Sequence, residues 1–327
     1  MMNKGLSRIV GLTCSVALVF SLTACGNNSN KDVDNEKKVY QIGICQLGQH
    51  DALDSATSGF MDALTEKLGD RVEFDYQNGE NSEDKCAEIA SKFVSDKKDL
   101  IMANATPALK SAYSATTTIP IVATSITDYG TALNMMKWSG VTGTNVTGTS
   151  DLAPIEEQEN MILELYGNPK QVGILYCVNE TNSVYQAQMM EDALEADGVK
   201  AELYTVNSVK DIEDVAVSAA TKCDVIYIPT DNTMAENVDV LKETFMNAGV
   251  PMIAGEEGMC EAGVATLSID YYSIGYTAGE MAYEILEEGS NPGSMEIQYA
   301  EQFTKKYNEE NCTALGIDIP DDYVAIK

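Results

Sequence analysis

The side chains best suited to binding chemistry lie just after short apolar runs, where predicted strands end. They are hydroxyls, amides, carboxylates and one imidazole. The set consists of His50, Asp51, Thr106, Ser125, Thr127, Asp151, Asn182, Ser183, Asp231, Asn232, Glu257 and Asp270. Ligands of open parallel α/β sheets bind outside the carboxyl ends of the strands, so the sequence predicts that these residues form one ligand site. Ser, Asp and Asn are also common helix N-caps, so any single member could merely start a helix.

The scarcity of basic residues narrows the chemistry of the ligand. Arg71 is the only arginine after residue 24, it precedes a predicted strand, and no predicted site position is a lysine. A guanidinium fork on a phosphate or carboxylate is therefore not expected. A ligand carboxylate would instead be held by backbone N–H groups and hydroxyls at Thr106, Ser125 and Thr127.

The acidic members of the set favour a cationic group. Asp151, Asp231, Glu257 and Asp270 outnumber the basic groups at these positions. A buried cation needs such a partner, and Asp231 is the expected first partner of a ligand ammonium group. A zwitterion satisfies both the carboxylates and the hydroxyls, whereas a phosphorylated ligand satisfies neither.

Catalysis has little support in the sequence. His50 is the only histidine, and the chain contains no GxSxG, Walker or GxGxxG motif. Cysteines 45, 86, 177, 223, 260 and 312 include no CxxC pair, so they are expected to be buried free thiols rather than metal ligands. We predict a binding protein, not an enzyme, with no metal and no cofactor.

Strand-like and helix-like segments alternate along the chain. The predicted strands span 41–47, 72–76, 100–103, 119–124, 172–177, 201–206, 225–228, 252–254 and 265–269. This pattern predicts an α/β fold with two doubly wound parallel-sheet lobes, covered by helices on both faces. Residues 143–151 show neither helical period nor strand alternation, so we expect them to cross between the lobes beside the ligand.

The N-terminus predicts export and a lipid anchor. Basic Lys4 and Arg8 precede the apolar run 9–22, which is too short to span a bilayer comfortably. Small residues precede Cys25, which resembles the lipidation site of a bacterial lipoprotein; a plain secretory peptide is the alternative. Residues 1–24 are then a signal peptide and residues 25–38 a disordered tether. The net charge of −30 argues against nucleic acid or an anionic lipid surface as a partner.

Several segments resemble a known family, the lipid-anchored substrate-binding proteins of ABC importers for tryptophan and other aromatic amino acids. The matching segments are His50-Asp51-Ala52-Leu53-Asp54, Ala105-Thr106-Pro107-Ala108, Ile119-Pro120-Ile121-Val122, Asn145 to Asp151, Asn182-Ser183, Pro229-Thr230-Asp231-Asn232 and Leu315-Gly316-Ile317. The resemblance implies a type I periplasmic-binding fold with three crossings, and an aromatic amino acid bound at the hinge. It also implies an ABC permease and its ATPase subunit as partners, on the extracytoplasmic face of the membrane.

The expected crossings lie near 143–151, 270 and 289–293. The first lobe is then 39–148 plus 271–292, and the second is 149–270 plus 293–327, in a monomer held to the membrane only by its anchor. Tyr129, Trp138, Tyr271 and Tyr272 are candidates for stacking on a ligand ring. A lipid-anchored ligand sensor of the same fold, or a transport protein for a sugar or nucleoside, remains an alternative.

Overall fold

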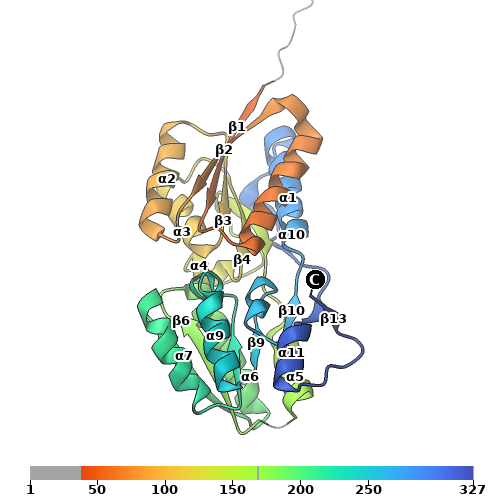
Figure 1. The fold of residues 1–327 in the computed structure, drawn as a ribbon. Coiled ribbons are helices and arrows are strands. Elements are labelled where there is room, and N and C mark those ends of the chain that lie inside the picture. The colour runs from red at the N-terminus through yellow and green to blue at the C-terminus, as the bar shows by residue number, and fades with distance from the viewer. Residues whose placement is uncertain (1–37, 168, 327) are drawn as a thin grey trace, which may run out of the picture. The chain divides into compact units, whose positions relative to one another are not determined.

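The structure is a computed structural model that describes residues 38–167 and 169–326 (Figure 1). The predicted signal peptide, Cys25 and all but the last residue of the predicted tether lie outside the described residues. Within the described part of the chain, no helix is long and apolar enough to cross a membrane. Its six cysteines are all buried and unpaired, as predicted.

The first sheet has the strand order β11-β5-β4-β3-β1-β2, and every neighbouring pair is parallel. Its strands are β1 (Tyr40–Gln46), β2 (Val72–Asn78), β3 (Leu100–Asn104), β4 (Ile121–Ile126), β5 (Val146–Ser150) and β11 (Gln298–Tyr299). Its helices are α1 (Asp51–Leu68), α2 (Glu83–Ser95), α3 (Thr106–Ala115), α4 (Tyr129–Ala132) and α10 (Tyr271–Tyr283). Strands β3 and β4 are buried along their whole length, as expected of a parallel sheet covered on both faces.

The second sheet has the order β13-β12-β10-β9-β8-β6-β7. Its strands are β6 (Gln171–Cys177), β7 (Lys200–Val206), β8 (Val225–Ile228), β9 (Met252–Ala254), β10 (Ala265–Ser268), β12 (Thr304–Tyr307) and β13 (Val324–Ala325). Its helices are α5 (Ile155–Tyr166), α6 (Thr181–Ala196), α7 (Ile212–Ala220), α8 (Asn232–Ala235), α9 (Val238–Ala248) and α11 (Glu309–Leu315). The predicted fold of two parallel-sheet lobes is confirmed, with β12 as an antiparallel exception beside β10.

The segment 143–151 differs from its prediction, because it contains the strand β5. All five residues of β5 are buried, although Val146 is the only one of them with an apolar side chain. The hydroxyl of Thr149 donates to the carbonyl of Ile274, which satisfies a polar group inside the core. Gly148 has φ +145°, and a Cβ there would lie 1.9 Å from the carbonyl oxygen of Ala123, so no other residue fits.

The C-terminal crossings place α10 and β11 on the first sheet. Helix α10 packs along α1, as Figure 1 shows, and β11 pairs with β5. The prediction assigned residues 293–327 to the second lobe, but β11 falls in that range and extends the first sheet. The chain returns to the second sheet only at β12. Residues 149 and 150 likewise end β5 instead of starting the second lobe.

Helices α1 and α10 approach each other through glycines. A Cβ on Gly275 would lie 2.0 Å from the carbonyl oxygen of Ala56, and one on Gly59 would lie 2.2 Å from that of Tyr272. The two backbones are therefore in direct contact. Since α10 begins at the second crossing, this packing fixes the position of Tyr271, its first residue.

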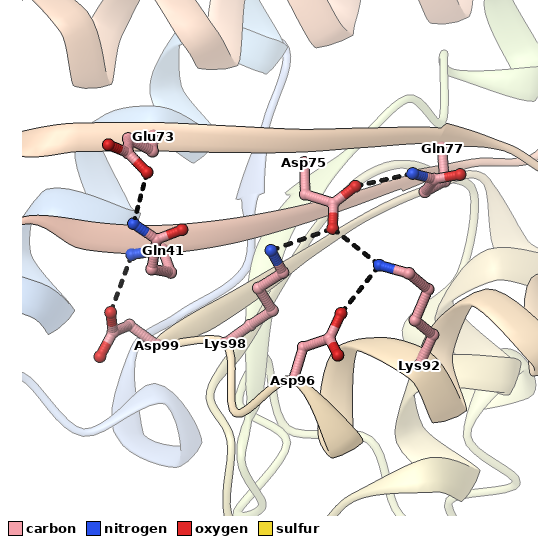
Figure 2. Close-up of polar contacts among 8 residues, drawn as sticks. All are labelled: Gln41, Glu73, Asp75, Gln77, Lys92, Asp96, Lys98 and Asp99. Carbon is pink, nitrogen blue, oxygen red and sulfur yellow. Dashed lines mark hydrogen bonds and ion pairs between the residues drawn. The ribbon is translucent and has the colours of Figure 1, made fainter.

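A network of charged side chains secures the edge strand β2 (Figure 2). Oδ2 of Asp75 lies 3.0 Å from Nζ of Lys98 and 3.1 Å from Nζ of Lys92, and Gln77 donates to Oδ1. Burial opposes ionisation of Asp75, but the hydrogen bonds from Gln77, Lys98 and Lys92 outweigh it and lower its pKa to about 2. The network ties β2 to the C-terminal end of α2.

Candidate functional site

A small cavity lies where strand ends of the two sheets face each other. It has a volume of about 10 Å³, room for about one water molecule. Its lining consists of His50, Leu53, Thr106, Ser125, Thr127, Asp151, Asn182, Thr230, Asn232 and Tyr271. The structure thus brings together His50, Thr106, Ser125, Thr127, Asp151, Asn182 and Asn232 from the predicted set.

The first-sheet wall of the cavity offers hydroxyls and a helix start. Thr106 is the first residue of α3, and Ser125 lies near the end of β4. Ala105 and Ser125 have φ values of +81° and +56°, a left-handed conformation that costs a non-glycine residue energy and is typical of functional sites. Ser125 is 6% exposed, and its Oγ has no hydrogen-bond partner among the described residues. A buried hydroxyl that lines the cavity in that state is available for a hydrogen bond to a ligand.

Asp151 is the carboxylate of the cavity. It follows β5, where the chain leaves the first sheet, and is 4% exposed. The hydroxyl of Thr127 donates to its Oδ1 at 3.1 Å, and that of Tyr271 donates to its Oδ2 at 3.1 Å. Burial raises the pKa of Asp151 to about 6, because desolvation outweighs these two hydrogen bonds. At neutral pH this carboxyl group is therefore mainly ionised, and neither of the two groups that donate to it is a cation.

The second-sheet wall is made of Asn182, Thr230 and Asn232. Asn182 lies at the start of α6 and Asn232 at the start of α8. Glu180 accepts hydrogen bonds from the side-chain amides of both, at 3.2 and 2.6 Å. Glu180 also accepts from the backbone N–H and the hydroxyl of Thr233, so it orients this wall without lining the cavity.

His50 connects the two walls. Its Nε2 lies 3.3 Å from Oδ1 of Asn232. The residue precedes α1 of the first sheet, whereas Asn232 opens α8 of the second. This hydrogen bond therefore spans the cleft and favours its closed form.

Asp231 does not line the cavity, contrary to its predicted role as first partner of an ammonium group. Its Oδ2 accepts from the backbone N–H of Cys177 at 2.7 Å, and its Oδ1 accepts from that of Met234 at 2.9 Å. Asp231 is thus the N-cap of α8 and a tie to β6. Burial, together with the nearby Glu180, raises its pKa well above the usual value.

Four other predicted residues also lie outside the lining. Glu257 pairs with Lys306 at 2.6 Å, so its charge is already matched. Asp270 is exposed and caps α10 through the backbone N–H of Ser273. Asp51 is exposed in the first turn of α1, and Ser183 is buried, with its hydroxyl 3.4 Å from the carbonyl of Thr230. Each serves a helix start or a structural contact.

Three lining residues were not in the predicted site. Leu53 falls on the inward face of α1, one turn after His50, and Thr230 immediately precedes Asp231. Tyr271 was named only as a stacking candidate, but its hydroxyl binds Asp151. The sequence signal that could have identified these three residues is their position close to predicted site residues.

The other stacking candidates are engaged elsewhere. Tyr129 and Trp138 stack on each other with ring centroids 6.2 Å apart. The hydroxyl of Tyr272 donates to Asp62 on the surface of α1. Among the described residues, no group of His, Cys, Asp and Glu side chains is arranged to hold a metal ion.

Comparisons with known proteins agree on one kind of protein. The family model described as ABC transporter substrate binding protein matches residues 41–326. A protein of Clostridioides difficile strain R20291 named tyrosine-binding protein is 35% identical over 325 residues, which cover 96% of this chain and 93% of that protein.

Two solved structures bear on the state of the cleft. An ABC domain from Streptococcus pneumonia in complex with L-Trp has a TM-score of 0.82 at 30% identity, covering 86% of this chain and 96% of that one. The ligand-free, open structure of a Clostridium difficile substrate-binding protein with adhesive properties has a TM-score of 0.69 at 32% identity, covering 88% and 99%. The two relatives have similar sequence identity to this chain, but the TM-score is higher for the complex than for the open form.

Proposed function

Because the chain belongs to the family of ABC transporter substrate-binding proteins, we propose that it captures an aromatic amino acid between its two lobes for import. Relatives at 30% and 35% identity are named for L-Trp and tyrosine, which supports this ligand class. The proposed chemistry is binding alone: the lobes close on the ligand and release it to a permease.

The observation that carries the proposal is the division of polar groups around the cavity. Thr106, Ser125 and the N-terminus of α3 offer donors that suit a carboxylate. Asp151 offers a buried negative charge that suits an ammonium group. The two sets line one cavity, so an α-amino acid can satisfy both at once.

A cavity with room for about one water molecule is too small for an amino acid, so we propose that binding requires hinge opening. The contact between His50 and Asn232 breaks when the lobes separate. The ligand then keeps the walls further apart than they are here. The moving bodies are the first lobe, 38–150 plus 271–299, and the second lobe, made of the described residues of 151–270 and 300–326.

The cellular setting is also part of the proposal. Cys25 carries the lipid anchor, and the folded part acts as a monomer on the extracytoplasmic face. Its partners are an ABC permease and the ATPase subunit of that permease. The position of Cys25 after a short apolar segment supports the anchor.

A thermal-shift screen of the protein from residue 26 onward, with the twenty amino acids, common sugars and nucleosides, tests the ligand class. Ligand at a hundred times its dissociation constant adds about 2.7 kcal/mol to the free energy of unfolding. Tyrosine, tryptophan or both should give the largest shifts. A shift confined to sugars or nucleosides would refute the proposed ligand class.

A further inference from the structure

The second-sheet wall of the cavity contains an acceptor without a donor. Asn182 is 6% exposed, and no described residue donates to its Oδ1. The atom belongs to a residue that lines the cavity. A buried carbonyl oxygen in that state is costly, which points to a donor supplied from outside the protein.

The orientation of this amide is fixed by its other half. Nδ2 of Asn182 lies 3.2 Å from Oε2 of Glu180, 3.1 Å from the carbonyl oxygen of Thr230 and 3.2 Å from Oγ of Ser183. Turning the amide around would set its oxygen against the carboxylate and the carbonyl, both of which are only acceptors. Oδ1 is therefore held on the side away from these groups.

The remaining groups of the cavity indicate which part of a ligand meets Asn182. The hydroxyls of Thr106 and Ser125 belong to the first sheet and its helices, and Asp151 follows β5 of the same sheet. The carboxylate and ammonium of an amino acid are thus both matched on the first-sheet side. The side chain of the ligand is left to face the second-sheet wall, where Asn182 lies.

We propose that Asn182 is a specificity-determining residue that accepts a hydrogen bond from the far end of the ligand side chain. This inference rests on the proposed function. A phenol O–H or an indole N–H supplies the donor. Phenylalanine supplies none and would leave Oδ1 buried and unpaired. A site built around a polar group rejects analogues that lack the matching group more strongly than an apolar pocket does.

Calorimetry on the wild-type protein with tyrosine, 4-aminophenylalanine, phenylalanine and O-methyltyrosine tests the proposal. The first two carry a donor at the ring end, and the last two do not. We expect the donor-bearing ligands to bind at least about tenfold more tightly. Equal affinity for tyrosine and phenylalanine would overturn the proposal while leaving the proposed function intact. Absence of binding by these four ligands and by tryptophan would refute the proposed function and this inference with it.

The variant Asn182→Leu removes the acceptor at similar volume. It should bring the four affinities within about threefold of one another, mainly by weakening tyrosine and 4-aminophenylalanine. The matched control is Asn179→Leu, in the exposed turn that precedes α6, which should keep the wild-type ratios. Equal weakening of all four ligands by Asn182→Leu would place the residue on the ammonium group and overturn the proposal. If the variant does not fold, as judged by circular dichroism, the wild-type ratios decide alone.

Discussion

At the scale of single residues, two buried aspartates near the candidate site have different roles. Asp151 and Asp231 both follow strands, and both are nearly inaccessible to solvent. The oxygens of Asp231 accept hydrogen bonds from backbone N–H groups. Those of Asp151 accept hydrogen bonds from hydroxyl groups beside the cavity. Asp231 is therefore structural, and Asp151 is the proposed partner of the ligand cation.

The first prediction separates the two residues. Asp231→Asn should lower the free energy of unfolding by about 1–3 kcal/mol, because its amide nitrogen would face a backbone N–H that loses its acceptor. Ligand affinity should stay within about threefold of wild type. Urea denaturation and calorimetry measure the two effects. A large loss of affinity with unchanged stability would return Asp231 to the ligand site.

The second prediction concerns pH. The pKa of Asp151 in the ligand-free protein is about 6, so ligand affinity should fall by up to about tenfold per pH unit below that value. Protonation removes the charge that pairs with the ammonium group. Calorimetry between pH 4.5 and 8 measures this, and Asp151→Asn should bind weakly with a flat profile. An unchanged profile in that variant would assign the titration to another group.

The same pKa shift has the opposite effect on the ligand-free fold. The folded protein keeps the proton of Asp151 up to about pH 6, but the unfolded chain keeps it only to about 3.8. Ionisation therefore destabilises the folded state, and this group's contribution to stability rises as pH falls from 6 toward 3.8. At 1.36 kcal/mol per pKa unit, the full effect is about 3 kcal/mol.

Sequence reasoning located most of the cavity lining but misjudged Asp231, and the reason is physical. An Asp before a short helix is equally suited to capping and to ligand binding. The choice depends on whether nearby N–H groups of β6 reach it, which is a tertiary contact. The sequence indicates Tyr271 only as a stacking candidate. Its hydrogen bond to Asp151 could not be predicted, because it joins two crossings that are far apart in the sequence.

At the scale of elements, strands β1, β3, β4, β6, β8 and β9 could be predicted because each is a short apolar run. Strand β5 could not, since its residues Val146–Ser150 are mainly small and polar. They are buried because neighbouring backbone and side-chain groups satisfy their hydroxyls, as for Thr149. Strand β11 has only two residues, too few for an alternation pattern.

The third prediction tests the glycine contact that positions α10. In Gly275→Ala the new Cβ would meet the carbonyl oxygen of Ala56 at 2.0 Å, so one helix must shift. The free energy of unfolding should fall by about 1–3 kcal/mol. Ligand affinity should also drop, since Tyr271 moves with the helix. Ser58→Ala, on the exposed side of α1, is the control and should change neither. A fully stable Gly275→Ala protein would contradict the close packing.

At the scale of the whole molecule, the proposed lipid anchor depends on Cys25, which a polar stretch follows. The net charge of −30 would repel an anionic lipid surface, so the proposed attachment is through the lipid alone. The fourth prediction is that Cys25→Ala abolishes lipidation. The wild-type protein should partition with membranes and take up labelled fatty acid. The variant should do neither and remain unprocessed by the lipoprotein pathway. Lipid incorporation in the variant would exclude Cys25 as the anchor.

The central claim is that the cleft recognises an aromatic amino acid as a zwitterion, and calorimetry with L-tyrosine and tyramine tests it most directly. Tyramine keeps the ring, hydroxyl and ammonium but lacks the carboxylate proposed to bind at Thr106 and Ser125. We predict that tyrosine binds at least about a hundredfold more tightly than tyramine, since several hydrogen bonds to a charged group are lost. Equal affinity for the two, or no binding of tyrosine, tryptophan or phenylalanine, would contradict the account.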